Sequence, residues 1–515
     1  MIRRMLSWRL LAGAVLVAAL TAVASACSSK APSRHLLIVV DGLRPDYVTP
    51  DVMPALTALA KRGVVFTRHH SVYPTVTRVN ASSISSGSYP EAHGLMGNSV
   101  FFPKVNATRF LSTADRANLV EIAKVDGRLL TATTLGELLQ AAGRRMLVVS
   151  SGSTGSSFLN NHTVSGGAIL HYRYALPESL AKEMKTLGAP PDEQALAGAL
   201  DRFAVDAFLK IGLPRVDPSV TVMWLSDLDS TAHDKGIGDP AMVDTLRHVD
   251  AQIARIEDGL KAAGLFETFN IWVTSDHGFS THTGAVALDG ILKPFTKTLP
   301  DGSPRLVADD GAIYVRDDDQ ATIATIVAAL QRTPGVGAIF TRAKARQLLD
   351  GSVPGTLSFD AIRWDHERSA QILFSPDWTD EENAHGFRGM VASGGVAGHG
   401  SASPWDVHNT LIAAGPDLKA GVTIETPSAN VDFAPTFLTM LGVPVPVAMH
   451  GRPLLEALNG RPNAATSVTT FTHTVRTPDG AYAATAMFST FSLNGRQSRY
   501  FDGAKVFRPS AEQPR

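Results

Sequence analysis

Continuously apolar runs alternate with segments of helical period over most of the chain. His35–Val40 is apolar after its histidine, which is typical of a strand buried on both faces. Asp51–Gly63 repeats apolar residues at helical spacing and ends at a glycine. The same criteria predict further strands over Val64–His70, Arg145–Ser151, Ser219–Asp229 and Phe269–Gly278, and further helices over Thr133–Arg144, Glu193–Gly212 and Met242–Gly264. This alternation predicts an α/β fold with a central, mostly parallel sheet and helices on both faces.

The alternation is interrupted between residues 285 and 385, where glycine, proline and acidic clusters separate shorter elements. We interpret this segment as an inserted, cap-like subdomain. The catalytic core would then comprise residues 35–284 and 386–460, and residues 461–515 would extend it at the C-terminus. Residues 98–128 form a second candidate insertion.

The N-terminus has the pattern of an export signal. Three arginines precede a short apolar run, Leu10–Val23, and small residues lead to Cys27. The sequence VASAC resembles a bacterial lipoprotein processing site, which predicts a signal peptide over residues 1–26 and a polar tether over residues 27–34. The protein would then be exported to the periplasm or cell surface and held to a membrane by a lipid on Cys27 alone. A plain signal peptide with an incidental cysteine is the alternative.

Composition excludes several classes of protein. Hydrophobic residues make up 44% and charged residues 18% of the 515, as in ordinary globular proteins. The formal net charge of −1 provides no basic field for nucleic acid or an anionic membrane surface. Cys27 is the only cysteine, so a disulfide within the chain is excluded. With Cys27 lipidated, no free thiol is left for a thiolate zinc site either. Nothing in the sequence indicates the oligomeric state.

Metal-type ligands follow four of the expected strands or the loops after them. In α/β sheets, ligands bind beyond the carboxyl ends of the strands. Carboxylate and imidazole together are typical of zinc and related divalent metals, and three histidines argue against calcium. Each residue alone has an ordinary explanation as a turn former or a surface residue, but six together suffice for two metals with a seventh ligand from elsewhere. The six are Asp41, Asp229, His233, Asp276, His277 and His399.

A threonine pair lies in the segment Tyr73–Gly87, YPTVTRVNASSISSG, which we expect to form a turn followed by a helix near Ser82. The segment contains no acid, lysine or cysteine that could activate a hydroxyl of Thr75 or Thr77. A threonine hydroxyl is a poor nucleophile unless a base or a metal activates it. If one of these threonines reacts, a metal ion is the expected source of its activation.

Six motifs between Asp41 and His399 occur in an order that resembles the alkaline phosphatase superfamily, and within it the nucleotide pyrophosphatase/phosphodiesterase group. They are VVDGLRPDY, YPTVTRVNASSISSG, YPEAHGLMGN, DLDSTAHDKG, SDHG and GHG. The resemblance implies two zinc ions, although other divalent metals also suit the ligands. It assigns one ion to Asp229, His233 and His399, and the other to Asp41, Asp276, His277 and the Thr77 hydroxyl.

The resemblance also implies the chemistry. Thr77, rather than Thr75, would be the nucleophile, and Asn98 would contact a phosphoryl oxygen of the substrate. The expected reaction is hydrolysis of phosphodiester or phosphoanhydride bonds through a phospho-threonine, with a phosphodiester, nucleotide or phosphonate as the small-molecule substrate. Arg78 departs from the family pattern. It either adds a phosphate contact or points to solvent or to an acid.

Two kinds of alternative remain. The first is another reaction on the same fold: a phosphonoacetate-type hydrolase, a phosphomonoesterase or a phosphoethanolamine transferase. Asn98 argues against the monoesterase, because those enzymes tend to use an arginine at this contact. The second is a non-catalytic surface binding module, against which the intact set of ligands argues.

Overall fold

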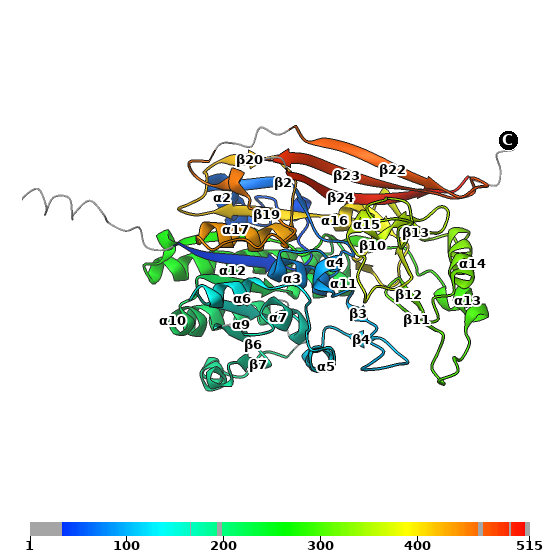
Figure 1. Cartoon of the computed structure of the whole chain (residues 1–515). Coiled ribbons are helices and arrows are strands. Elements are labelled where there is room, and N and C mark those ends of the chain that lie inside the picture. Colours follow the sequence, from blue (N-terminus) through cyan, green and yellow to red (C-terminus); the bar gives the residue numbers. More distant parts are fainter. Residues whose placement is uncertain (1–32, 165, 193–197, 462–466, 494–495, 510–515) are drawn as a thin grey trace, which may run out of the picture.

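The computed structural model describes residues 33–509 except 165, 193–197, 462–466 and 494–495 (Figure 1). The expected signal peptide, Cys27 and most of the tether lie outside these residues. Among the described helices, none combines the length and the apolar character that crossing a membrane requires.

A ten-stranded sheet forms the centre of the fold (Figure 1). Strand β1 (Arg34–Val40) pairs in parallel with β8 (Val220–Leu225) on one side and β9 (Phe269–Thr274) on the other. The strand order is β20-β2-β19-β9-β1-β8-β5-β6-β7, with β21 beside β2. The remaining strands are β2 (Val64–His70), β5 (Met146–Ser150), β6 (Ala168–His171), β7 (Tyr174–Leu176), β19 (His408–Ala414), β20 (Val422–Ile424) and β21 (Ser428–Ala429).

Most of these pairings are parallel; only β19 with its two neighbours and β7 with β6 are antiparallel. Successive side chains of a strand point to opposite faces of the sheet, so alternate residues of β1 pack into two apolar cores, one on each face. Leu36, Ile38 and Val40 pack with α2 (Pro54–Arg62), α9 (Ala199–Ala207) and α12 (Pro240–Ala262). Leu37 and Val39 pack with α3 (Thr77–Ser86), α6 (Leu135–Ala141), α7 (Thr154–Asn160) and α17 (Phe433–Met440). The predicted α/β architecture is confirmed.

Two boundaries near the candidate site differ from the prediction. Strand β8 ends at Leu225, and Asp229 lies instead on helix α11 (Asp227–Lys235), because the chain turns into a helix directly after Ser226. Helix α3 begins at Thr77 rather than near Ser82. The Arg78 N–H in its first turn is satisfied by the side chain of Asn98, at 3.1 Å, so a residue distant in sequence caps this helix.

The expected helix over Glu193–Gly212 is described in part. Residues 193–197 lie outside the described residues, and α9 runs over Ala199–Ala207 before a π-helical turn over Phe208–Gly212. The helical segment therefore runs past the predicted end at Gly212, because α10 (Leu213–Val216) follows the π-helical turn without a break.

The segment interpreted as an insertion carries a separate five-stranded sheet, order β11-β12-β15-β13-β14, beside helix α14 (Gln320–Gln331). Its strands are β11 (Leu306–Asp309), β12 (Ala312–Val315), β13 (Val336–Thr341), β14 (Leu357–Ser358) and β15 (Ile372–Pro376). A four-stranded sheet combines β10 (Ser280–His282), which precedes these strands in the chain, with β16 (Trp378–Glu382), β17 (Arg388–Val391) and β18 (Ala397–Gly398), which follow them. The exact domain boundaries stay a prediction.

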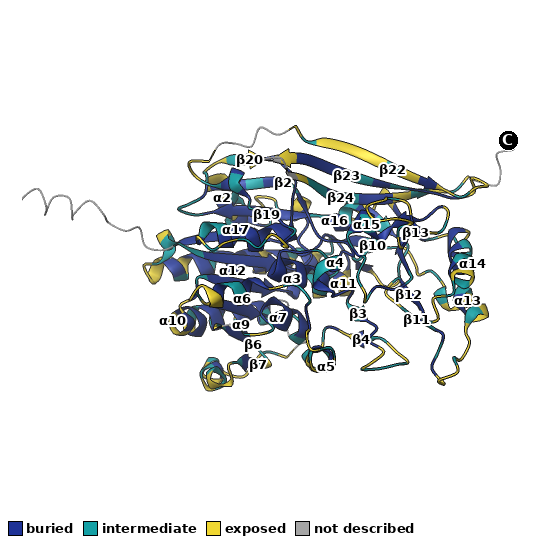
Figure 2. Cartoon of the chain, in the orientation of Figure 1, coloured by how far each residue is buried: buried dark blue, intermediate teal, exposed yellow. Residues whose placement is uncertain are grey.

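The C-terminal segment forms a three-stranded sheet of β22 (Thr469–Arg476), β23 (Ala483–Leu493) and β24 (Arg496–Phe507). Figure 2 shows that β22 is exposed along most of its length, whereas the central strands are buried. Ala484 and Phe488 of β23 share one apolar core with the five-stranded sheet and with Tyr73, next to the threonine pair. The C-terminal sheet thus supports the loop that presents these threonines.

Candidate metal centre

The carboxyl ends of β1 and β9 bring Asp41, Asp276 and His277 together. The Nε2 atom of His277 lies 3.3 Å from Asp41 Oδ1 and 3.1 Å from Asp276 Oδ2. All three side chains are buried. Residues more than 230 positions apart meet here because β1 and β9 are parallel neighbours in the sheet.

A second group, Asp229, His233 and His399, lies beside the first. On helix α11 the i, i+4 spacing places Asp229 and His233 on one face, where His233 Nε2 is 3.3 Å from Asp229 Oδ1. His399 follows β18 and brings its Nε2 to 3.5 Å from the same oxygen. The rings of His399 and His277 stack with centroids 3.4 Å apart, so the two groups adjoin.

Backbone carbonyls fix the orientation of all three imidazoles. The Nδ1 atoms of His233, His277 and His399 lie 2.9, 2.9 and 2.8 Å from the carbonyl oxygens of Ala397, Gly278 and Thr75. A carbonyl oxygen only accepts, so each Nδ1 carries the proton and donates it. The Nε2 atoms are therefore directed into the two groups, which is the arrangement of histidines that bind metals.

The carboxylates present unpaired oxygens at the same place. Asp41 Oδ1, Asp229 Oδ1 and Asp276 Oδ2 are buried and make no hydrogen bond. The other oxygens of the two most buried carboxylates are bonded: Asp41 Oδ2 accepts from the Trp224 indole at 2.8 Å, and Asp276 Oδ1 accepts from Gly42 N–H at 3.3 Å. Leaving carboxylate oxygens buried and unpaired is costly, so a cation is the expected partner.

The spacings also suit metal ligands better than ion pairs. Charge-assisted N–H···O bonds are about 2.7–2.9 Å long. The nitrogen–oxygen separations within the two groups are 3.1, 3.3, 3.3 and 3.5 Å. Tetrahedral bonds of about 2.0–2.1 Å place neighbouring ligand atoms about 3.3 Å apart. The residues present therefore fit two divalent ions, one in each group.

The pKa values in the buried group, Asp41, Asp276 and His277, also indicate a site for a cation. Burial raises the pKa of Asp276 well above its usual value, and the charge of Asp41 adds to this rise. Burial alone would lower the pKa of His277, but the carboxylates of Asp276 and Asp41 outweigh it and raise the pKa to about 10. The concentrated negative charge that raises both pKa values also favours binding of a cation.

The two threonines lie in different surroundings. Thr77 is the first residue of α3, and its Oγ1 is 3.3 Å from His277 Nε2, at the edge of the buried group. The Thr75 hydroxyl donates to the Ser401 carbonyl at 2.9 Å and accepts from Gly400 N–H at 3.1 Å. Thr75 thus fixes the loop that carries His399, whereas Thr77 faces the ligands.

Asn98 and Arg78 both lie near Thr77, the first residue of α3, and each of them lines a different cavity. Since Asn98 Oδ1 accepts the Arg78 N–H, the amide NH₂ of Asn98 is directed away from the helix and toward a cavity of about 380 Å³ that His233 and His399 also line. Arg78 lines a second, more polar cavity of about 570 Å³ together with Thr77 and Asp41. The two ligand groups lie where these cavities approach each other.

Sequence reasoning missed the residues that hold the ligands in place. Trp224 lies opposite Val39 in the β1–β8 register and so brings its indole to Asp41. Asn430 donates its amide to the backbone carbonyl of Asp276 at 2.9 Å. Neither residue has a local motif that signals this role, because each acts across more than 150 positions of sequence.

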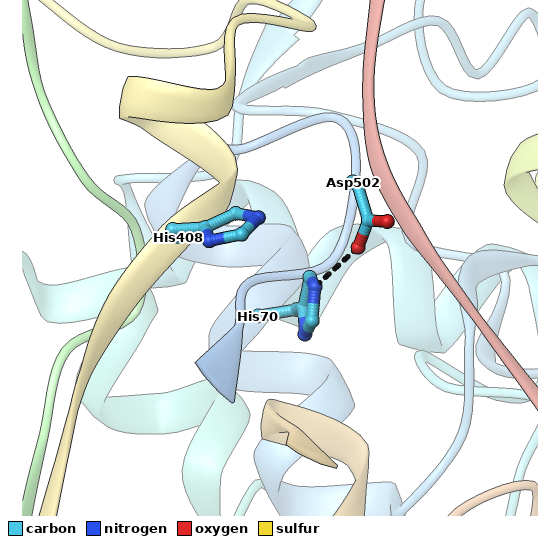
Figure 3. A group of neighbouring side chains, drawn as sticks. All are labelled: His70, His408 and Asp502. Carbon is cyan, nitrogen blue, oxygen red and sulfur yellow. Dashed lines mark hydrogen bonds and ion pairs between the residues drawn. The ribbon is translucent and has the colours of Figure 1, made fainter. Parts of the chain in front are cut away.

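A third group of ligand-type side chains, His70, His408 and Asp502, joins β2, β19 and β24 (Figure 3). His70 Nε2 lies 2.7 Å from Asp502 Oδ1, the length of a charge-assisted hydrogen bond rather than of two metal ligands. His70 Nδ1 lies 2.9 Å from the Ser428 carbonyl, so both ring nitrogens are used, one by a carbonyl and the other by the Asp502 carboxylate. This group is a buried ion pair that holds the C-terminal sheet to the core.

We expect Asp502→Ala to lower the free energy of unfolding by about 2–4 kcal/mol, because it leaves a nitrogen of the buried His70 side chain without its carboxylate partner. Chemical denaturation monitored by fluorescence measures the loss. The control is Asp350→Ala, which removes a more exposed His473–Asp350 pair and should cost under about 1 kcal/mol. Equal losses in the two variants would contradict the assignment of a buried ion pair.

Comparisons with known proteins place the chain in a family. Residues 35–379 match the model of the type I phosphodiesterase / nucleotide pyrophosphatase family. Human ectonucleotide pyrophosphatase/phosphodiesterase family member 1 is 27% identical over 246 residues, which are 47% of this chain and 23% of the human protein. A bovine bis(5'-adenosyl)-triphosphatase is 27% identical over 282 residues, 54% of each chain. The match thus spans about a quarter of the human relative and about half of the bovine one.

Solved structures share the fold. Murine ectonucleotide pyrophosphatase/phosphodiesterase 5 superposes with a TM-score of 0.57 at 18% identity, covering 80% of this chain and 96% of that one. A mutant of the alkaline phosphatase PafA superposes with a TM-score of 0.64 at 14% identity, covering 84% of this chain and all of the other. With the family model matching most of its length, the chain belongs to the type I phosphodiesterase/nucleotide pyrophosphatase family.

Proposed function

We propose that this protein is a two-zinc hydrolase that cleaves phosphodiester or phosphoanhydride bonds through a phospho-threonine on Thr77. The observation that carries the proposal is the position of Thr77 Oγ1, 3.3 Å from His277 Nε2, at the edge of the buried ligand group and next to the second one. No basic side chain makes a hydrogen bond to this hydroxyl among the described residues other than His277, whose Nε2 faces the carboxylates.

Asp41, Asp276 and His277 would hold one ion, and Asp229, His233 and His399 the other. Bound zinc supplies Lewis acidity, which lowers the pKa of a coordinated oxygen and stabilises charge on the attacking and leaving oxygens. Thr77 Oγ then attacks phosphorus, the bond to the leaving oxygen breaks, and that oxygen departs with the electron pair. Water hydrolyses the phospho-threonine in the second step and restores the Thr77 hydroxyl.

Asn98 would stabilise the phosphoryl group during both steps. Its carbonyl oxygen is occupied by the Arg78 N–H, so the amide NH₂ is free to donate to a phosphoryl oxygen in the adjoining cavity. A donor held in place before the reaction costs no reorganisation when charge develops on that oxygen. A neutral amide suits a diester, which carries a single negative charge.

The cavity beside Asn98 suits an uncharged organic substituent of the substrate. Its walls include Tyr73, Phe110, Tyr314 and Phe374, and its only carboxylate is that of Asp310. No lysine or arginine is among the described residues that line it. Aromatic walls bind flat or apolar groups, and the absence of a cation disfavours a second phosphate there.

Two relatives support this substrate class. Murine ectonucleotide pyrophosphatase/phosphodiesterase 5 has been solved with AMP in a form described as inactive, in which a threonine is replaced by alanine. The bovine relative is named as a bis(5'-adenosyl)-triphosphatase. We infer that nucleotides with diester or anhydride linkages are the first substrates to test on this chain.

We expect the zinc-loaded protein to hydrolyse bis-p-nitrophenyl phosphate with a kcat/KM at least about tenfold above that for p-nitrophenyl phosphate, because one substituent can enter the aromatic cavity while the other departs. Release of p-nitrophenol measures both rates. The reverse ratio would make the protein a phosphomonoesterase and overturn the proposal. A panel of dinucleotides, nucleoside triphosphates and phosphonates then ranks natural substrate classes.

A further inference from the structure

Arg78 is half-buried and carries a positive charge that no carboxylate contacts directly among the described residues. Its Nε is buried without a hydrogen bond, and no hydrogen bond or ion pair among the described residues involves its guanidinium. The buried arginines Arg44, Arg305 and Arg452 differ, since each is bonded to one or two carboxylates. Leaving the Nε atom buried without an acceptor is costly, so the position of this side chain favours an anionic partner in the cavity that Arg78 lines.

The surroundings place that partner at the reaction centre. Arg78 follows Thr77 directly, and both line the polar cavity of about 570 Å³ together with Asp41 and Asp229. The remaining wall contains one more carboxylate and one more guanidinium, those of Asp115 and Arg173. It is otherwise rich in small hydroxyl side chains, which are Ser112, Ser151, Ser153, Thr154, Ser226 and Ser230. An anion in this cavity can contact the guanidinium while its phosphorus lies near the Thr77 hydroxyl.

Four carboxylates, those of Asp41, Asp229, Asp276 and Asp310, act on Arg78 through space, and none of them forms an ion pair with it. In the proposed enzyme the first three would face two divalent cations, and Asp310 would offset the remaining positive charge. Arg78 adds one positive charge to this balance, and that charge attracts a phosphoryl group with two negative charges more strongly than one with a single charge.

We propose that Arg78 is a substrate-binding residue that gives the site selective affinity for doubly charged phosphoryl groups, namely phosphomonoester dianions and inorganic phosphate. This inference rests on the proposed two-metal function. Arginine suits the role because its planar guanidinium binds two phosphoryl oxygens at once and stays charged when buried. The diester preference set by Asn98 is thereby reduced, and the phosphate released at the end of the reaction competes with substrate.

Calorimetric titration of the zinc-loaded enzyme at pH 8 with inorganic phosphate and, separately, with dimethyl phosphate tests this without turnover. At that pH the first probe is mainly a dianion and the second a monoanion. In Arg78→Gln, the affinity for inorganic phosphate should fall at least about tenfold more than the affinity for dimethyl phosphate. Arg78→Lys should recover part of the loss, because it restores the charge without the planar fork.

Arg109→Gln is the matched control, since Arg109 is an exposed arginine that lines neither cavity. It should leave both affinities within about twofold of the wild type. An equal fall for both probes in Arg78→Gln, with zinc content retained, would overturn the inference while leaving the proposed function intact. Failure of the proposed function would appear differently, as a wild-type protein that hydrolyses no diester.

Discussion

Replacing Thr77 with alanine is expected to lower turnover of bis-p-nitrophenyl phosphate by about 10³-fold or more while about two zinc ions per chain remain bound. The hydroxyl is the only atom of this side chain that can attack phosphorus, and it contacts the ligand group at its edge. The carboxylates and imidazoles that hold the metals are untouched. Loss of a nucleophile commonly removes several orders of magnitude in kcat. Stopped assays and elemental analysis of the same preparation measure both quantities.

Thr75→Ala is the matched control, two residues away in the same segment. Its hydroxyl bonds to Ser401 and Gly400, so its loss loosens the loop that carries His399. We expect a fall of about tenfold or less, because the His399 Nδ1 still donates to the Thr75 backbone carbonyl. If Thr75→Ala abolished turnover and Thr77→Ala did not, the nucleophile would be Thr75 and the assignment wrong.

Removing divalent metals with a chelator is expected to abolish turnover and to destabilise the fold, and added zinc should restore both. The unpaired oxygens of Asp41, Asp229 and Asp276 lose their counter-charge when the cations leave. The side chains of Asp41 and Asp276 are buried, so water cannot replace the cations there. Ligands that bind only the folded state stabilise it in proportion to the logarithm of their concentration, so the melting temperature should rise with free zinc. Full activity below about 0.1 metal ion per chain would exclude the proposed metal centre.

The third group of ligand-type residues provides an internal control for the metal count. If His70, His408 and Asp502 form an ion pair rather than a metal site, Asp502→Ala should retain the same two ions per chain as the wild type. His399→Ala should retain one, since it removes a ligand from the more exposed group only. A third ion that disappears in Asp502→Ala would refute the ion-pair interpretation.

Much of the fold could be predicted because it depends on local patterns. The apolar run His35–Val40 corresponds to β1 within one residue, and the pattern over Met242–Gly264 corresponds to most of α12. Helix boundaries were less accurate where a distant residue decides them. Thr77 begins α3 because Asn98 accepts a hydrogen bond from its first turn, and Asp229 lies on α11 because β8 ends four residues before it.

For the candidate site, the sequence by itself determined the donor types. Its aspartates and histidines at strand ends predicted a divalent centre, since those atoms bind zinc wherever they converge. Only the tertiary structure decided that they form two adjoining groups, that backbone carbonyls direct the histidines, and that the Nε atom of Arg78 is buried without a partner. These properties depend on contacts such as the one between His399 and Thr75, 324 positions apart, which no local pattern encodes.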